Sequence, residues 1–96
     1  MASKRVKATS IVEIDNDRVI VTRWQFEPGA ETGWHRHERD YVVVPLTDGQ
    51  LLLESKDGES KATLQSGKPY SRSLGVEHNT VNNNDFDFAF VEIELK

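Results

Sequence analysis

The sequence predicts a small all-β protein that folds as one domain, and three observations support this prediction. The chain has 96 residues, which is close to the commonest size of a single domain. Its apolar residues occur in short runs separated by turn residues at intervals of about 8–12 positions, a spacing typical of a β-sandwich or barrel. Its composition, with 36% hydrophobic and 29% charged residues, is that of a folded chain rather than a disordered one.

The predicted strands follow one another along the chain. Residues 19–26 are rich in β-branched and aromatic side chains, with Trp24 and Phe26 on one face. Residues 41–44 are apolar at every position, as expected of a strand that is buried on both faces. Turn residues separate the strands, for example in the hairpin at residues 56–59. The next predicted strands are residues 50–54, 61–65, 69–73 and 76–81.

Residues 86–95 form the last predicted strand, and in this strand the apolar residues change faces. Phe86, Phe88 and Phe90 share one face, whereas the apolar residues from Val91 to Leu95 share the other. Because side chains alternate with a period of two, this pattern requires either a bulge or burial of both faces. We expect one face to lie in the core and part of the other to lie against a second copy of the chain.

Charge and cysteine content exclude several classes of protein. With 12 basic and 16 acidic side chains the formal net charge is −4, so the chain has no broad cationic surface for nucleic acid or anionic lipid. Cysteine is absent, so a metal would need histidine, carboxylate or backbone ligands. No apolar segment has the length of a signal peptide or a membrane span, and we therefore expect a cytoplasmic protein without nucleic-acid or membrane partners.

Two of the three histidines lie one residue apart in the charged segment 33–41. Side chains at positions i and i+2 of a strand point to the same face, so His35 and His37 could share one metal ion. An isolated pair of this kind is more often part of an exposed, charged loop. Here turn residues precede the pair, an apolar strand follows it, and a third histidine, His78, comes later in the chain. This context favours a metal site.

The spacing around the first two histidines resembles the first motif of the cupin superfamily. That motif has a glycine, five further residues, an H-x-H pair, a glutamate and a closing glycine. Gly29, His35, His37 and Gly49 occupy the matching positions of this chain.

The second cupin motif has the pattern G-x5-P-x-G-x2-H-x3-N. Gly67, Gly75, His78 and Asn82 match it at the correct spacing, and Ser73 replaces the proline. The two matching segments are separated by the expected hairpin, so the resemblance covers most of the chain.

The resemblance implies a cupin-type jelly-roll barrel, also called a double-stranded β-helix, formed by a single cupin domain over residues 1–96. Residues 1–8 would be an N-terminal extension, and residues from about 10 to 96 would form the barrel. The chain is also similar to small single-domain bacterial cupins, some of which are named as β-alanine-degradation proteins. Cupins commonly pair, so we expect a homodimer.

The resemblance fails at one position of the first motif. Its glutamate, normally the fourth metal ligand, would fall on Tyr41 or Val42, and neither is a carboxylate. Asp40 is adjacent, but a shift of one residue turns a side chain to the opposite face, so Asp40 would reach the metal only through a bulge. If Tyr41 points inward, its hydroxyl could bind a metal-bound water or the substrate, which makes it the candidate catalytic residue. The alternative is a core aromatic residue.

The resemblance therefore implies a three-histidine metal site formed by His35, His37 and His78. Cupins with such sites include thiol dioxygenases and diketone-cleaving dioxygenases, which hold Fe(II) without a carboxylate ligand. The expected cofactor is a divalent transition metal, with iron favoured and nickel, zinc or manganese as alternatives. Without an anionic ligand the metal centre is more positive, so we expect a small anionic substrate or ligand.

Several functions remain open at this point. The leading hypothesis is a metal-dependent enzyme with dioxygenase-like chemistry, ahead of isomerase or lyase chemistry. The alternatives are a non-catalytic module that binds a sugar or an acid, and a stress or regulatory protein. Arg23, Arg39 or Arg72 could hold a carboxylate by bidentate hydrogen bonds, although most arginines on small domains face solvent.

Overall fold

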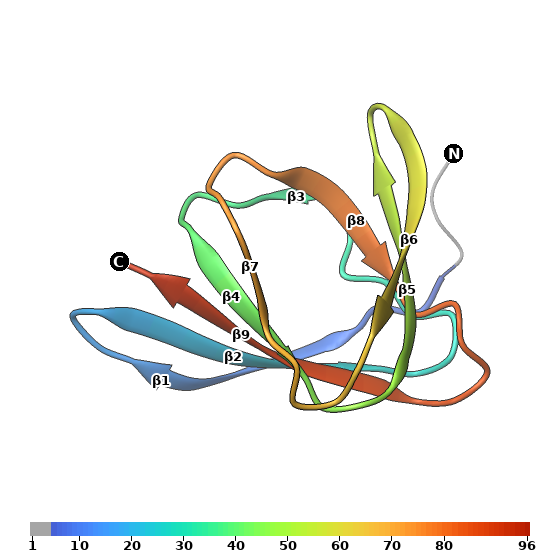
Figure 1. Cartoon of the computed structure of the whole chain (residues 1–96), viewed down its shortest axis with the longest axis horizontal. Coiled ribbons are helices and arrows are strands. Elements are labelled where there is room, and N and C mark those ends of the chain that lie inside the picture. Colours follow the sequence, from blue (N-terminus) through green and yellow to red (C-terminus); the bar gives the residue numbers. More distant parts are fainter. Residues whose placement is uncertain (1–4) are drawn as a thin grey trace.

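The computed structural model describes residues 5–96 and consists of two antiparallel β-sheets (Figure 1). The five-stranded sheet contains, in spatial order, β1 (Thr9–Asp15), β2 (Val19–Phe26), β9 (Phe88–Leu95), β4 (Tyr41–Pro45) and β7 (Tyr70–Arg72). The four-stranded sheet contains β3 (His35–Arg36), β8 (Glu77–Val81), β5 (Gly49–Ser55) and β6 (Gly58–Leu64). The predicted all-β architecture is thus confirmed. Across residues 5–96 we find no helix with the length and apolar character needed to span a lipid bilayer.

Each strand expected from the sequence is present, with ends shifted by a few residues, but β1 and β3 were not anticipated. All seven residues of β1 are exposed at the edge of the sheet. A bulge between Val12 and Ile14 shifts the register with β2, so the alternation of side chains between the two faces is interrupted there. β3 has only two residues and forms because His35 pairs with His78 on β8. Neither strand carries the apolar alternation that marks a half-buried strand.

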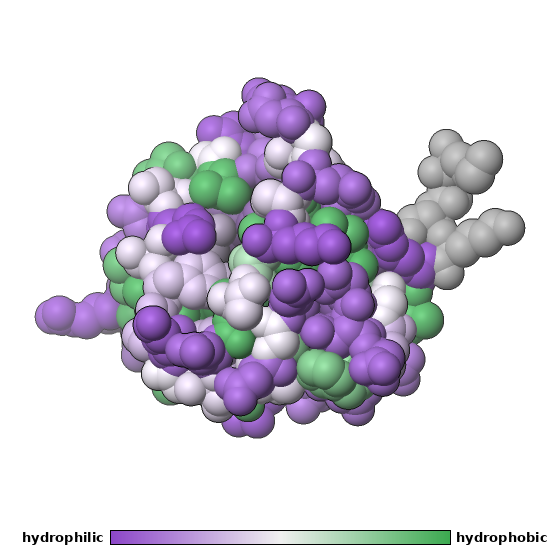
Figure 2. All heavy atoms as spheres, turned by 45° about the vertical axis from the view of Figure 1, so that its right-hand side comes forward, coloured by the Kyte–Doolittle hydropathy of each residue, from purple (hydrophilic) through white to green (hydrophobic). Residues whose placement is uncertain are grey.

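The core lies between the inner faces of the two sheets. Phe26 on β2 and Phe88 on β9 are neighbours in register, and both are 1% exposed. The ring of Phe26 also packs against that of Phe90, with 5.5 Å between centroids. Leu51 on β5 closes the core from the four-stranded sheet. Figure 2 shows a face of the molecule on which hydrophilic residues predominate and apolar residues are scattered.

The segment before β1 runs beside the loop that leads to β3. The backbone N–H of Ala8 donates to the carbonyl of Glu31 at 2.8 Å, and the N–H of Glu31 donates to the carbonyl of Val6 at 2.9 Å. An N-terminal extension was expected at residues 1–8, and residues 1–4 of it lie outside the described residues. The part that is described is held against the barrel by these backbone hydrogen bonds.

Asn82 fixes the turn that joins β8 to β9. Its side chain is fully buried, and its amide nitrogen lies within hydrogen-bond distance of the carbonyls of Phe26, Glu27 and Phe86. Its Oδ1 accepts from the backbone N–H of Asn84 at 3.1 Å. A buried carbonyl without a partner costs about 1–3 kcal/mol, so this side chain stabilises the turn. The asparagine of the second sequence motif therefore has a structural task.

β9 does not change faces along its length. Its register with β2 is continuous, so the alternative of a bulge in this strand is wrong. Phe88 and Phe90 are buried on the inner face, and Glu92 occupies the next inner position. Val91 and Ile93 are half-buried on the outer face. The apparent change of parity arises because the inner face continues with glutamate after Phe90.

Candidate metal centre

Backbone pairing brings the three histidines together from two separate segments. His35 on β3 pairs directly with His78 on β8. His37 lies just beyond β3, where its N–H donates to the carbonyl of Val76 at 2.8 Å and its carbonyl accepts from the N–H of Gly75 at 2.7 Å. Gly75 has a φ of 93°, in the left-handed region that favours glycine. The motif glycine thus lets the second segment turn against the first.

The Nε2 atoms of the three rings converge. Nε2 of His37 lies 3.0 Å from that of His35 and 3.2 Å from that of His78. The potential ligand atoms of all three residues lie within 4.8 Å of one another. Metal–imidazole bonds of about 2.0–2.1 Å would place nitrogens in adjacent coordination positions roughly 3 Å apart. The cluster therefore fits one metal ion, and no carboxylate among residues 5–96 belongs to it.

Gly33 and Thr32 orient the ring of His35. Its Nδ1 lies 2.8 Å from the carbonyl oxygen of Gly33. A carbonyl oxygen only accepts, so Nδ1 carries the proton and Nε2 of the neutral ring holds a lone pair. The hydroxyl of Thr32 donates to the same carbonyl at 2.9 Å. A hydrogen bond of this kind fixes the tautomer of many metal-binding histidines.

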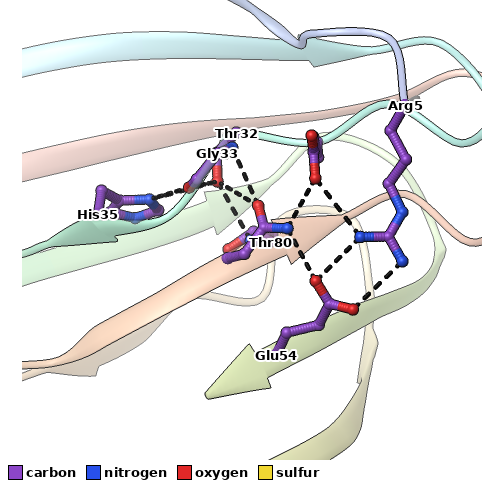
Figure 3. Close-up of polar contacts among 8 residues, drawn as sticks. Arg5, Thr32, Gly33, His35, Glu54 and Thr80 are labelled. Carbon is purple, nitrogen blue, oxygen red and sulfur yellow. Dashed lines mark hydrogen bonds and ion pairs between the residues drawn. The ribbon is translucent and has the colours of Figure 1, made fainter. Parts of the chain in front are cut away.

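A polar network supports the loop that carries His35, and Figure 3 shows Arg5 and Glu54 at its other end. Asn79 is buried, and its Oδ1 accepts from the N–H of Gly33 at 2.9 Å. Its amide donates to Glu31 at 2.8 Å and to Glu54 at 2.9 Å. Arg5 donates to the same two carboxylates, at 3.4 Å and 2.9 Å. The network links the segment before β1 to the histidine loop, and it satisfies polar groups that would be costly if left unpaired.

Two of the three histidines are neutral at pH 7. Burial, together with the neighbouring rings of His35 and His78, lowers the pKa of His37 to about 4. Burial, followed by the effects of His35 and Arg72, lowers the pKa of His78 to about 4. A neutral imidazole keeps a lone pair for a metal ion. These two rings therefore need not lose a proton before a metal binds.

Tyr41 points inward. It is 3% exposed, and its ring stacks on that of His37 with 3.8 Å between centroids. Burial, followed by the charge of Glu92, raises the pKa of Tyr41 above its ordinary value, so the hydroxyl stays protonated at neutral pH. The side chain also lines the cavity in front of the histidines. Tyr41 can thus donate a hydrogen bond into that cavity.

A cavity of about 240 Å³ lies between the two sheets, and the three histidines form part of its wall. Apolar side chains, among them Leu51 and Phe90, cover much of the remaining wall. Polar side chains from the five-stranded sheet complete it: Tyr41, Tyr70, Arg72 and Glu92. Burial, followed by the nearby charge of Glu94, raises the pKa of Glu92 to about 7. The cavity therefore contains a carboxyl group that is partly protonated at neutral pH.

Asp40, Arg23 and Arg39 lie outside the cavity that the three histidines line. The carboxylate of Asp40 is exposed and accepts from the N–H of Leu74 at 2.8 Å, so the bulge that would bring it to the metal is absent. Arg23 forms an ion pair with Glu13 at 3.2 Å. Of the three arginines considered as carboxylate-binding residues, Arg72 lines the cavity and the other two do not.

Glu92, Tyr70 and Asn79 were not selected from the sequence. A signal for Glu92 was present, because it shares the parity of Phe88 and Phe90 and so places a charged residue on a predicted core face. No comparable signal marked Tyr70 or Asn79. The hydrogen-bond partners of Asn79 and the other residues of the cavity that Tyr70 lines come from distant segments of the chain, which only the fold brings together.

Known proteins are similar to this chain along its whole length. A protein from Pseudomonas aeruginosa, named β-alanine degradation protein BauB, is 55% identical over 94 residues, which cover 98% of this chain and 99% of that protein. A solved cupin domain from Bordetella pertussis is 56% identical, with 99% of both chains covered and a TM-score of 0.96. A double-stranded β-helix domain from Klebsiella pneumoniae has a TM-score of 0.77 at 18% identity, with 99% of this chain and 81% of that chain covered. No protein-family model matches the chain.

The chain therefore belongs to the cupin superfamily, as its two motifs predicted. Within that superfamily it is similar to the Pseudomonas protein over nearly the full length of both. In a cupin, a cluster of three histidines on the wall of the barrel indicates a metal site.

Removal of single histidines tests whether the cluster binds a metal. We expect His35→Ala and His78→Ala each to lower metal affinity by at least about tenfold, because each variant loses a ligand. Metal content of the purified proteins, measured by mass spectrometry, checks this. Arg36→Ala serves as the control, since Arg36 is exposed and lies between the two histidines of the first segment. Unchanged metal content in both histidine variants would contradict a metal site.

Glu92→Gln should change how stability depends on pH. The folded-state pKa of about 7 lies above the unfolded value of 4.5. The folded state favours the protonated carboxyl. Its contribution to the free energy of unfolding is therefore fully present below pH 4.5 and is lost as the pH rises through 7. Between pH 5 and pH 8 the wild-type protein should lose about 2 kcal/mol of unfolding free energy relative to Glu92→Gln. Urea unfolding across this range measures the difference.

Other titratable groups lie near Glu92. Beyond the effect of burial, the charge of Glu94 on β9 raises the pKa of Glu92, and the charge of Glu92 in turn raises the pKa of Tyr41 and Tyr70 on the neighbouring strands. The pKa values of both tyrosines are raised above their ordinary value, so neither tyrosine ionises between pH 5 and pH 8 in either protein. The exposed variant Glu38→Gln is the control and should follow the wild type. Parallel curves for wild type and Glu92→Gln would show that the buried carboxyl does not titrate as expected.

Proposed function

We propose that the protein is a metal-dependent cupin enzyme that acts on a small anionic metabolite at His35, His37 and His78. Dioxygenase-like chemistry is favoured over isomerase or lyase chemistry. The observation that supports this most is the convergence of three histidine nitrogens on the wall of a cavity. A structural metal site is closed by protein ligands, whereas a catalytic site keeps open positions beside a space for substrate. Three histidines beside a cavity leave such positions open, which supports a catalytic site.

Iron is the metal we favour, and nickel, zinc and manganese are the alternatives. Imidazole nitrogens from His35, His37 and His78 suit each of these ions. When bound, the ion would supply Lewis acidity or, as ferrous iron, reactivity toward dioxygen. Because the cluster includes no carboxylate, the ligands do not neutralise the charge of the ion. That net charge favours an anionic substrate.

Tyr41 is the residue that we propose as catalytic. Its ring stacks on His37 and its hydroxyl remains protonated, so it can donate a hydrogen bond to an oxygen atom of a substrate beside the histidines. The apolar side chains of Leu51 and Phe90 limit access of water to the same space. The name of the Pseudomonas relative places that protein in β-alanine degradation, which supports a small substrate related to amino-acid catabolism.

Oxygen consumption tests the catalytic proposal. We expect the iron-loaded protein to take up dioxygen with a small thiol, β-dicarbonyl, amino acid or hydroxy acid. Tyr41→Phe should lower kcat by about 10²-fold or more while metal content stays unchanged, because only the hydroxyl is lost. The zinc-loaded protein is the control and should consume no dioxygen. If no compound supports uptake but one binds tightly, dioxygenase-like chemistry is wrong and the result favours a non-catalytic binding module.

We also propose that two copies of the chain pair through the outer face of the five-stranded sheet. Val42 and Val44 on β4 lie beside Ile93 and Val91 on β9 in register, and all four are half-buried on this face. The four valine and isoleucine side chains form a continuous apolar surface, and surfaces of this kind commonly mark interaction sites.

Sedimentation at micromolar concentration tests the dimer. The wild-type chain should sediment as a dimer, and Val91→Glu should sediment as a monomer because a charge would be buried at the interface. Asp87→Lys is the control, since Asp87 is exposed in the turn before β9 and should leave the dimer intact. A wild-type monomer would contradict the proposal.

A further inference from the structure

Two side chains of opposite charge line the cavity on the sheet that faces the histidines. Arg72 comes from β7 and Glu92 from β9. β4 lies between these strands, where Tyr41 pairs with Arg72 and Val43 pairs with Glu92. The register therefore places the two charges on one inner face, on either side of the same strand.

The spacing of the sheet leaves room for a ligand between these charges. Arg72 and Glu92 are two strands apart and also two residues apart along the strand direction. With strands about 4.8 Å apart and about 3.4 Å per residue, their Cα atoms are separated by roughly 12 Å. Their side chains extend into a cavity of about 240 Å³. This volume is below the 300–1,000 Å³ or so that is typical of drug-sized ligands, so the cavity suits a small metabolite.

Neither charge is neutralised within the described part of the chain. The ion pairs formed among residues 5–96 include neither Arg72 nor Glu92. Glu92 is 9% exposed and has the indole N–H of Trp24 as a hydrogen-bond donor, while the charge that acts on its pKa is that of Glu94, which has the same sign. A carboxyl group buried without a counter-charge is unfavourable when ionised.

Arg72 is available at the exposed side of the cavity. Its guanidinium stacks 4.7 Å from the centre of the Tyr70 ring, and one N–H donates to the carbonyl of Ser71 at 2.9 Å. A guanidinium has five N–H groups, so donors remain for a carboxylate. The stacking contact holds the planar group in place, which lowers the entropy lost when a ligand binds.

We propose that this cavity binds a small zwitterion, an amino acid whose carboxylate contacts Arg72 and whose ammonium group contacts Glu92. This inference rests on the proposed function and refines its substrate class, because the carboxylate remains the anionic group of the substrate and an ammonium group is added to it. A ligand with only a carboxylate leaves Glu92 without a counter-charge, and a ligand with only an ammonium group leaves Arg72 unpaired. A zwitterion satisfies both groups in one binding event.

Calorimetric titration of the metal-loaded protein at pH 7 tests the proposal. The probes are glycine, 3-aminopropanoate and 4-aminobutanoate, together with propanoate and propylamine, which each carry one of the two charges. We expect at least one of the three amino acids to bind about tenfold more tightly than either singly charged probe. Glu92→Gln should remove the advantage over propanoate, and Arg72→Gln should remove the advantage over propylamine.

A matched control separates Glu92 from other carboxylates of the cavity. Glu77 also lines the cavity, but it is exposed and already accepts from the indole N–H of Trp34 at 2.9 Å. Glu77→Gln should therefore keep the wild-type preference. Thermal unfolding of each variant establishes that it is folded, so that a lost preference reports on binding.

Proton release gives an independent measurement. Because the pKa of Glu92 is about 7, a bound ammonium group should ionise this carboxyl and release a proton. The heat of amino-acid binding should therefore depend on the ionisation enthalpy of the buffer in the wild type and not in Glu92→Gln.

Three outcomes would overturn the zwitterion site: propanoate binding as tightly as every amino acid, an unchanged preference in Glu92→Gln, or no binding of any amino acid at millimolar concentration. Metal content and oxygen uptake are measured on the same preparations. Oxidation of a simple acid without a preference for zwitterions would leave the proposed function intact and refute only this inference.

Discussion

The antiparallel pairing of His35 with His78 is the contact on which the candidate site depends. It joins segments that are distant in the sequence, and it creates β3 from only two residues. His37 then lies against Val76 through backbone hydrogen bonds, so its ring meets the other two. The positive φ of Gly75 permits this close approach. Without this pairing His78 would remain apart from the segment that carries His35 and His37.

The register of the five-stranded sheet determines what faces the histidines. Tyr41 and Val43 point inward from β4. Residues paired with them share this inner face: Arg72 on β7 pairs with Tyr41, and Glu92 on β9 pairs with Val43. Glu92 thereby occupies a position that, by the pattern of Phe88 and Phe90, would otherwise suit an apolar side chain. A buried carboxyl opposes folding once it ionises. Its presence in a small core is most simply explained by a task in the cavity.

The polar groups around the histidine loop illustrate the opposite situation, in which burial is compensated. Asn79 uses both its oxygen and its amide nitrogen to join Gly33 to Glu31 and Glu54. Within residues 5–96, no buried side-chain nitrogen or oxygen atom lacks a hydrogen-bond partner. A satisfied network of this kind restricts the loop to one arrangement, which holds the ring of His35 in the orientation that the cluster requires.

The sequence by itself determined the all-β class, most of the strands, the membership in the cupin superfamily and the three histidines, because short apolar runs and fixed motif spacings are local properties. It also identified Tyr41 as the residue at the missing carboxylate position, but it left open whether that side chain points inward. The tertiary structure decided this through its stacking on His37. It also decided that Asp40 stays outside, that β9 has no bulge, and that Glu92 and Arg72 share one cavity. These facts depend on register between strands that are far apart in the chain, and no local pattern encodes that register.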